Sequence, residues 1–346
     1  MNKRILITGG FGFVGSHFTE HFLKNTDWEV VILDRLSYAA DIHRVTDAKY
    51  LKGYEDRLSV VYHDLKYSFP EAIIDKLGKF DYIVHLAANS HVDRSITNPK
   101  EFFEDNVLGT VNMLEFLRLH NPEARFINFG TDEVFGAAPD NYNYKERDRW
   151  NPSNPYSASK CGQLAAGISY HTTYGLDIIT TYTMNIFGER QHPEKLVPLA
   201  MKKIINGEQM IIHSKLKAGC TLFKLPSGNY VTEDPTDVIE VGERHWLHAR
   251  NAADAILYIL KNGIKGEHYN VVGDTELSND EFVLMIGKVL GKPVKLVYED
   301  FHSCRPGHDR RYALDGTKLA ELGWKPPYSF EESLKKTVEW TLENDK

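Results

Sequence analysis

The sequence predicts an α/β fold that is built on a doubly wound parallel sheet. Between residues 3 and 183, short apolar segments alternate with segments of helical apolar spacing, a pattern typical of strand–helix–strand units with parallel strands. The first apolar segment, residues 3–8, leads into a glycine-rich turn that opens a helical pattern, and the second, residues 29–33, ends in an aspartate. These observations also indicate where a ligand binds, because open parallel sheets hold ligands at the carboxyl ends of their strands.

The glycine-rich turn predicts a dinucleotide-binding site of the Rossmann type. Gly9, Gly12 and Gly15 follow the first strand with the spacing GxxGxxG. Glycines here allow the backbone to turn sharply and to approach a pyrophosphate, which then lies at the helix N-terminus. Asp34 follows Gly15 by 19 residues (34 minus 15), where an acid that binds the ribose 2′-hydroxyl is expected. A carboxylate there repels a 2′-phosphate, so the sequence favours NAD over NADP, although the adjacent Arg35 leaves NADP open.

Further strands and helices extend the predicted sheet. Residues 58–62 form a strand that is followed by Asp64, which is placed to reach the adenine edge. Residues 82–86 form the next strand, and the small residues Ala87 and Ala88 after it allow the backbone to lie against a cofactor. The remaining elements of this part are helices over 100–120 and 156–174 and a strand over 176–182. The apolar stripe of the helix over 100–120 is interpreted as core or as a helix–helix contact.

Two polar runs beyond a predicted strand over 125–129 supply candidate catalytic groups. Thr131, Asp132 and Glu133 come after this strand, at the edge of the sheet where ligands bind. Tyr156 and Lys160 are four residues apart, so a helix places both on one face. An ammonium beside a phenol favours the phenolate, and two carboxyl groups can serve as an acid and a base. The alternative is that both runs are solvated surface residues, but their combination with a predicted cofactor site favours the catalytic interpretation.

Composition excludes several classes of protein. The 346 residues indicate about two domains, and the formal charge of -7 gives no support for binding nucleic acid or a membrane. Apolar runs are far shorter than the roughly 20 residues of a spanning helix. Cys161, Cys220 and Cys304 are scattered and odd in number, so we expect no disulfide framework and a cytoplasmic location. His245 and His248 have no carboxylate or cysteine partner nearby in the sequence, and we expect no metal site.

The pattern loosens after residue 183, which indicates a second region. Residues 207–243 are rich in glycine and charge and are predicted to be loops or a small hairpin. We expect a Rossmann domain over 1–183 plus about 244–262, and a smaller C-terminal α/β substrate-binding domain over 184–243 and 263–346. The predicted elements of the later part are helices over 252–261, 280–290 and 330–342 and a strand over 268–272. Ser278 or Asn279 is the expected N-cap of the helix over 280–290.

With these residues placed, the chain resembles the extended short-chain dehydrogenase/reductase superfamily. Within it, the chain is most similar to the nucleotide-sugar 4,6-dehydratases, of which dTDP-glucose 4,6-dehydratase is the type. The resemblance runs nearly from end to end, and Thr131-Asp132-Glu133 is its specific part, since related epimerases and decarboxylases usually lack the acidic pair. The motifs that carry it are the GxxGxxG run, Leu33–Ala39, His85–Ala88, Ser90–Ile96, Thr131–Gly136, Tyr156–Lys160, Pro193–Pro198 and Arg305–Tyr312.

The resemblance implies a role for each candidate residue. Tyr156 is the base for the sugar 4-hydroxyl, Lys160 lowers its pKa and holds the nicotinamide ribose, and Thr131 hydrogen-bonds the sugar. Glu133 removes the C5 proton, and Asp132 protonates the departing 6-hydroxyl. The implied ligands are NAD and a nucleoside-diphosphate hexose such as dTDP- or UDP-glucose, bound by a homodimer whose helices over 100–120 and 156–174 pair. The implied NAD contacts are Gly9, Gly12, Phe13, Val14, Gly15, Asp34, Arg35, Ser37, Asp64, Leu65, Leu86, Ala87, Ala88, Tyr156 and Lys160, and the implied substrate contacts are Ser90, Asn185, Lys195, Leu196, Arg244, Asn270, Arg305 and His308.

Three departures from the family pattern leave the sugar and the nucleotide open. Asn89 stands where the type enzyme commonly has glutamate, residues 188–192 replace a Gly-Pro-Tyr-Gln-Phe-like run, and residues 214–243 are expanded. We hypothesise that residues 214–243 fold over the nucleotide end of the site and set its selectivity. The alternatives for the whole chain are a nucleotide-sugar 4-epimerase or decarboxylase of the same superfamily and, from another class, a catalytically inactive NAD-binding sensor.

Overall fold

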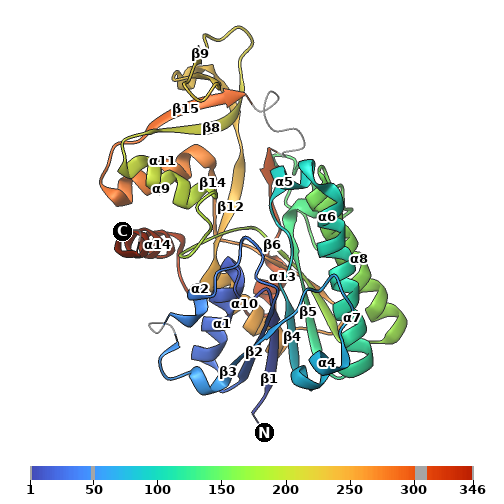
Figure 1. The fold of residues 1–346 in the computed structure, drawn as a ribbon. Coiled ribbons are helices and arrows are strands. Elements are labelled where there is room, and N and C mark those ends of the chain that lie inside the picture. Colours follow the sequence, from blue (N-terminus) through green and yellow to red (C-terminus); the bar gives the residue numbers. More distant parts are fainter. Residues whose placement is uncertain (1, 48–50, 301–309, 345–346) are drawn as a thin grey trace.

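Seven parallel strands form the main sheet of the computed structural model, which describes residues 2–47, 51–300 and 310–344 (Figure 1). Their order across the sheet is β13-β6-β5-β4-β1-β2-β3, so the predicted doubly wound sheet is confirmed. The strands are β1 (Arg4–Thr8), β2 (Glu29–Asp34), β3 (Leu58–Tyr62), β4 (Tyr82–His85), β5 (Arg125–Thr131), β6 (Ile178–Thr183) and β13 (His268–Val271).

The strand order places a topological switch point beside β1. The chain runs from β1 through β2 to β3 at one edge, returns to the other side of β1 with β4, and continues outward through β5 and β6. A crevice opens at such a point beyond the carboxyl ends of the strands. The outermost strand, β13, pairs with β6 and belongs to this sheet, although the sequence placed residues 263–346 with the substrate-binding region.

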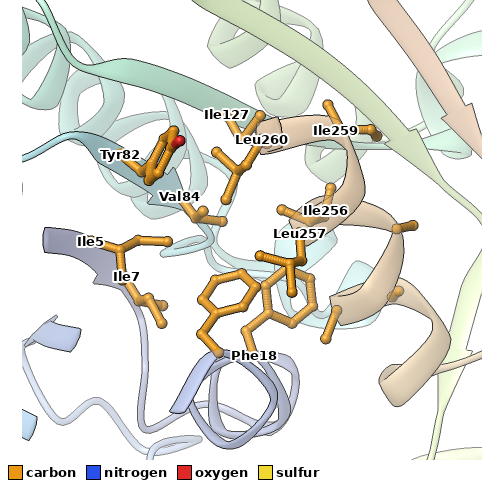
Figure 2. Close-up of a cluster of buried hydrophobic side chains, with 14 of the residues drawn as sticks. Ile5, Ile7, Phe18, Tyr82, Val84, Ile127, Ile256, Leu257, Ile259 and Leu260 are labelled. Carbon is orange, nitrogen blue, oxygen red and sulfur yellow. The ribbon is translucent and has the colours of Figure 1, made fainter. Parts of the chain in front are cut away.

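Helices cover both faces of the main sheet. One face carries α1 (Phe13–Asn25), α10 (Ala249–Asn262) and α13 (Thr317–Glu321), and the other carries α4 (Glu71–Leu77), α7 (Gly109–His120) and α8 (Pro155–Tyr174). Figure 2 shows Phe18 of α1 and Leu257 of α10 pointing toward Ile7 and Val84 of the sheet. Strands that are apolar on both sides are typical of sheets covered in this way.

The predicted helix over 100–120 is interrupted. It consists of α6 (Pro99–Phe103), a π-helical segment η2 (Glu104–Leu108) and α7, and the short helix α5 (Val92–Thr97) precedes it. The wider turn of the π segment buries Asp105 and Asn106 side by side. Single π turns inside α-helices are frequent at functional sites, and both residues contribute to the site described below.

The region beyond β6 contains two smaller sheets, which corrects the prediction that residues 207–243 are loops or a small hairpin (Figure 1). In the strand β8 (Gln209–Leu216), alternate side chains such as Met210 and Ile212 are buried, and glycine and charge elsewhere in the segment hid this period-two pattern. Helices α9 (Leu196–Ile205), α11 (Asn279–Leu290) and α14 (Phe330–Asn344) share a core with this region. The strands are β7 (Asn185–Phe187), β8 (Gln209–Leu216), β9 (Phe223–Lys224), β10 (Tyr230–Thr232), β11 (Val238–Val241), β12 (Glu243–His248), β14 (Thr275–Ser278), β15 (Lys295–Asp300) and β16 (Arg311–Tyr312).

Glu189 and Arg190, two of the residues that depart from the family pattern, tie the two regions together. The carboxylate of Glu189 lies 3.0 Å from Nε2 of His248 and 3.1 Å from Nζ of Lys336. Burial alone would raise the pKa of Glu189, but the close contact with His248 and the neighbouring charges bring it below its ordinary value. Arg190 donates to Glu20 of α1 at 2.7 Å and to the main-chain oxygen of Arg44 at 2.9 Å. This loop therefore has a structural role between the cofactor-side helices and α14.

A buried imidazole links the glycine turn to α7. Nδ1 of His85 lies 2.8 Å from the hydroxyl of Thr8, and Nε2 lies 2.9 Å from the hydroxyl of Thr110. The Thr110 hydroxyl donates to the oxygen of Asn106, so it can only accept from His85, which assigns the hydrogen to Nε2. The Thr8 hydroxyl already accepts from the amides of Leu86 and Ala87, so a second proton on Nδ1 has no good acceptor. Burial lowers the pKa of His85 to about 3.

We predict that His85 makes the fold sensitive to acid. Its pKa is about 3 in the folded chain and 6.5 in the unfolded chain, so only the unfolded chain binds the proton between these values. The free energy of unfolding should therefore fall as the pH falls below 6.5, by about 1.4 kcal/mol per pH unit from this residue. Urea unfolding at pH 7, 6 and 5 measures the slope. His85→Gln should reduce it by about one proton, whereas His43→Gln, at an exposed position, should not. An unchanged slope in His85→Gln would contradict the assignment.

Candidate active site

A cavity of about 390 Å³ lies at the carboxyl ends of the main-sheet strands. It is lined by residues that follow β1, β2, β3, β4, β5 and β6, as expected for a crevice at the switch point. Every residue that the sequence analysis assigned to NAD and every residue that it assigned to catalysis lines this cavity. The structure thus brings together residues between 9 and 160 that the sequence alone could assign only to the ends of separate strands.

The glycine turn after β1 has the shape of a phosphate cradle. Gly9 has a φ of +71°, which favours glycine, and a Cβ on this residue would lie 3.0 Å from the main chain of Ala87. A Cβ on Gly15 would lie 2.1 Å from the main-chain oxygen of Gly9, so any other residue would displace the turn. Gly12 is the N-cap of α1, and the first amides of this helix have no partner within the helix. These features fit the pyrophosphate of a dinucleotide.

Asp34, at the end of β2, is fixed by the main chain on both sides. Its Oδ2 accepts from the amide of Phe11 at 3.0 Å, and its Oδ1 accepts from the amide of Leu36 at 2.8 Å. The side chain is buried and held at the wall of the cavity. A carboxylate in this position can still accept hydrogen bonds from a ribose, because each oxygen has a second lone pair.

The candidate base Tyr156 is positioned by contacts at the start of α8. Asn154 caps the helix and forms a capping box with Ser157. The amide of Tyr156 donates to the hydroxyl of Ser95 at 3.1 Å. One turn further, Ser159 accepts from the side chain of Asn106 at 2.9 Å, which joins α8 to the π segment. The phenol therefore sits on a helix whose first turns are held from three directions.

Burial dominates the ionisation of Tyr156 and Lys160. Both are nearly fully buried, and burial lowers the pKa of Lys160 to about 7. Its ammonium donates to the main-chain oxygen of Phe129 at 2.8 Å and to the side chain of Gln163. Burial, and then the nearby Glu133, raise the pKa of Tyr156 above its ordinary value. This direction is opposite to the lowering by Lys160 that was expected from the sequence, because burial and the Glu133 charge act on the phenol while the ammonium is bound to Phe129 and Gln163.

The adjacent carboxyls Asp132 and Glu133 are able to hold a proton near neutral pH. Thr131 ends β5 and donates through its hydroxyl to Oδ1 of Asp132 at 3.0 Å, and the turn η3 (Asp132–Phe135) begins there. Oδ2 of Asp132 and Oε2 of Glu133 are buried and have no hydrogen-bond partner among the described residues. Burial raises the pKa of Asp132 to about 6, and burial together with the charge of Asp132 raises that of Glu133 to about 7. Such a pair suits one acid and one base.

The predicted substrate residues divide into those that reach the cavity and those that do not. Ser90, Asn185 and Lys195 line it, and Nδ2 of Asn185 is buried without a hydrogen-bond partner among the described residues. Leu196 begins α9 outside the lining. Arg244 also lies outside it, with its guanidinium 4.3 Å from the ring centre of Tyr312, and its charge offsets part of the rise in the pKa of Asp132 and Glu133. The remaining predicted substrate residues, Arg305 and His308, lie outside the described residues.

The assignment of Asn270 to the substrate does not fit the structure. Its side chain is fully buried in β13, away from the cavity lining. Both hydrogens of its side-chain amide are used, because Nδ2 donates to the main-chain oxygens of Tyr144 and Asp315 at 2.9 Å each. Asn270 therefore fastens the loop after η3 and the segment before α13 to the edge of the sheet. The hypothesis that residues 214–243 cover the nucleotide end gains no support either, since none of the described cavity-lining residues comes from that segment.

Several residues of the site were not found from the sequence. Tyr38 lies in the loop after Asp34, Arg44 lies in the short helix α2 (His43–Thr46), and His192 and Glu194 lie before α9. In the sequence they are marked only by being close to predicted site residues, and closeness in sequence does not show which side chains face the cavity. Asp105 had no signal, because the inward turn of its side chain depends on the π segment. The departing residue Asn89 is bound to Asn106 through its main chain and lies outside the lining.

Two further properties concern the described part of the chain as a whole. In the ranges 2–47, 51–300 and 310–344, no cluster of three or more His, Cys, Asp or Glu side chains is arranged to hold a metal ion. Within the same ranges, none of the helices is both long enough and apolar enough to cross a membrane.

Comparisons with known proteins identify relatives that span the chain. A family model described as GDP-mannose 4,6 dehydratase matches residues 6–218 and 236–337. The dTDP-glucose 4,6-dehydratase of Shigella flexneri is 35% identical, over 99% of this chain and 93% of its own. The low-salt glycan biosynthesis protein Agl12 of Haloferax volcanii is 36% identical over 99% of both chains. The crystal structure of DesIV, a dTDP-glucose 4,6-dehydratase of Streptomyces venezuelae with NAD and TYD bound, has a TM-score of 0.82 and 34% identity, and covers 99% of this chain and 97% of that chain.

The extent of these matches shows the class of the protein as well as its fold. The two-faced parallel sheet and the cavity at its switch point are those of a short-chain dehydrogenase/reductase. Within that superfamily, the chain belongs to the nucleotide-sugar 4,6-dehydratases and is an enzyme. The family resemblance on which the sequence analysis relied is thereby confirmed.

Proposed function

We propose that this nucleotide-sugar 4,6-dehydratase converts a nucleoside-diphosphate hexose, such as dTDP- or UDP-glucose, to the corresponding 4-keto-6-deoxyhexose. The observation that carries this proposal is the pair of adjacent carboxyls, the buried Asp132 and the partly buried Glu133, in one cavity with Tyr156 and Lys160. Eliminating water across C5 and C6 requires an acid and a base at neighbouring carbons, and adjacent residues at one strand end can supply both. The relatives named as dTDP-glucose 4,6-dehydratases support the glucose series as first substrate.

NAD is the cofactor, and the residues around the glycine turn suit it. We assign the pyrophosphate to the turn at Gly9 and Gly12, the adenosine ribose to Asp34, and the nicotinamide ribose to Lys160. Related dTDP-glucose 4,6-dehydratase structures are described as containing NAD. NAD held by these residues would supply the acceptor and then the donor of the hydride that leaves C4 of the sugar and returns at C6, and its positive charge would favour the ionised phenol of Tyr156.

The proton steps fall to the side chains of this chain. Tyr156 takes the proton of the 4-hydroxyl, and Thr131 hydrogen-bonds the same oxygen. The resulting 4-keto group acidifies the C5 proton, which Glu133 removes. Asp132 protonates the 6-hydroxyl as it leaves as water. With pKa values of about 6 and about 7, the two carboxyls hold about one proton between them from pH 6 to 7, and the assigned roles require this proton to be on Asp132 when Glu133 takes the C5 proton.

The alternatives require less of this site. A 4-epimerase needs the Tyr156 base and a cofactor but has no step for a buried acid beside a buried base. A catalytically inactive NAD-binding sensor has no use for Thr131, Asp132 and Glu133, yet all three line the cavity with Tyr156 and Lys160. For the substrate, we assign its diphosphate and sugar to Ser90, Asn185 and Lys195, and by resemblance to Leu196, Arg244, Arg305 and His308.

We also propose the division of the chain and its location. The cofactor region comprises residues 1–183 and about 244–262, with β13 added, and the rest binds the nucleotide sugar. Cys161 and Cys220 are free thiols, which is consistent with a reducing, cytoplasmic compartment.

We predict that substitutions separate the two halves of the reaction. In D₂O, Asp132→Asn should still exchange the C5 hydrogen of the sugar through Glu133, but it should form product more slowly by about 10²-fold or more. Glu133→Gln should lose product to a similar extent and should also lose the C5 exchange. Tyr156→Phe should show neither, because no 4-keto group forms. Mass spectrometry of product and of recovered substrate measures all three.

The matched controls for these variants are Asp75→Asn and Glu321→Gln, at exposed positions on α4 and α13. They change the same chemical groups away from the cavity and should behave as the parent enzyme. Full turnover by both Asp132→Asn and Glu133→Gln would rule out the assigned acid and base.

We propose a homodimer in which α7, α8 and the preceding π segment pair with their copies. Leu108, Leu119 and Tyr174 are 46%, 57% and 51% exposed in the single chain, and a second copy could cover them.

We predict that sedimentation velocity at micromolar concentration gives a dimer and that Leu108→Glu shifts it toward monomer. A monomeric parent protein would refute this arrangement.

A further inference from the structure

The adenosine end of the cavity holds an arginine that is already bound by carboxylates. Arg35 donates through one guanidinium nitrogen to Oδ1 of Asp105 at 2.8 Å and through the other to Oδ2 at 2.6 Å. It also contacts both oxygens of Asp64 at 3.3 Å. The side chain of Asp105 is 5% exposed and that of Arg35 is 29% exposed. Two-point pairing of this kind is the strongest and most directional form of an arginine–carboxylate contact.

The placement of Asp105 is a local feature of this chain's π segment. The same segment buries Asn106, which binds Asn89 and Ser159, so the backbone on both sides of Asp105 is fixed. Lys66 lies 3.8 Å from Asp105 and 3.9 Å from Asp64, outside hydrogen-bond range. The lining at this end contains the carboxylates of Asp34, Asp64 and Asp105 and the cations Arg35, Arg44 and Lys66, so its formal charges balance.

An arginine directly after the ribose-binding acid is otherwise suited to a 2′-phosphate, because such an arginine can accommodate NADP. In this structure its guanidinium is occupied. A 2′-phosphate would meet the carboxylate of Asp34 and would also have to replace the carboxylate of Asp105 as the partner of Arg35. Repulsion by Asp34 and the pairing of Arg35 with Asp105 are separate obstacles to the 2′-phosphate, and removing one of them leaves the other.

We propose that Asp105 is a coenzyme-specificity residue, which holds Arg35 so that the site takes NAD and not NADP. The inference rests on the proposed NAD function of the cavity and assigns to Asp105 a role that the glycine turn and Asp34 do not supply. It requires that Asp34 and Asp105 act together on NADP binding, because each blocks a different contribution to binding the 2′-phosphate.

The test compares bound nucleotides in four full-length proteins: the parent, Asp34→Ser, Asp105→Asn and the double variant. Each is incubated with equal concentrations of NAD and NADP, free nucleotide is removed, and the bound nucleotides are released by denaturation and quantified. The double variant should raise the ratio of NADP to NAD at least about tenfold above the product of the two single effects. Asp75→Asn, at an exposed site, serves as the control and should match the parent.

Arg35→Ala identifies the group responsible. In the double-variant background it should remove the gain in NADP. In the Asp34→Ser background, where Asp105 still holds Arg35, it should leave NADP uptake unchanged, and this comparison does not depend on how well Asp105→Asn folds. A full gain from Asp34→Ser alone, or a gain that survives Arg35→Ala in the double variant, would overturn the inference. A parent protein that prefers NADP would overturn the cofactor assignment as well, whereas NAD preference with additive single effects would overturn the inference alone.

Discussion

The burial of four ionisable side chains in one cavity is the constraint on which the rest of the site depends. Asp132, Tyr156 and Lys160 are buried, Glu133 is partly buried with its Oε2 shielded from water, and burial is the largest influence on the pKa of each. Raising the pKa of Asp132 from 3.8 to about 6 corresponds to about 3 kcal/mol of lost preference for its charged form. The fold must hold these groups in place against that cost, and it does so with rigid elements: the end of β5 and the first turns of α8.

The surrounding structure can be understood as support for this arrangement. The Ser95, Asn154 and Asn106 contacts fix the start of α8, and Thr131 holds one oxygen of Asp132 while leaving the other without a partner among the described residues. Glu189 and Arg190 join α1 to β12 and α14 through the ion pairs Arg190–Glu20 and Glu189–Lys336 and the contact of Glu189 with His248, so these contacts connect the two sides of the cavity. Loops alone would not hold the catalytic side chains to the same geometry.

The sequence predicted what depends on local pattern. The main strands, the glycine turn, the placement of Asp34 and the partnership of α8 with the end of β5 follow from periodicity and from the rule that ligands bind at carboxyl ends of strands. It failed where the outcome depends on tertiary packing. The strand β8 was missed because its buried face is completed by α9 and α11, and Asn270 was misassigned because its partners come from residues 144 and 315. The direction of the Tyr156 pKa shift could not be read from a spacing of four, since it depends on burial and on where the Lys160 ammonium is bound.

The central claim is that hydrogen moves within the sugar while Glu133 exchanges with water at C5, and isotope tracing tests it most directly. A nucleoside-diphosphate glucose labelled with deuterium at C4 is converted in H₂O, and the unlabelled substrate is converted in D₂O. The account predicts that the C4 label appears at C6 of the product and that solvent deuterium appears at C5. Solvent deuterium at C6, or loss of the C4 label to water, would contradict it.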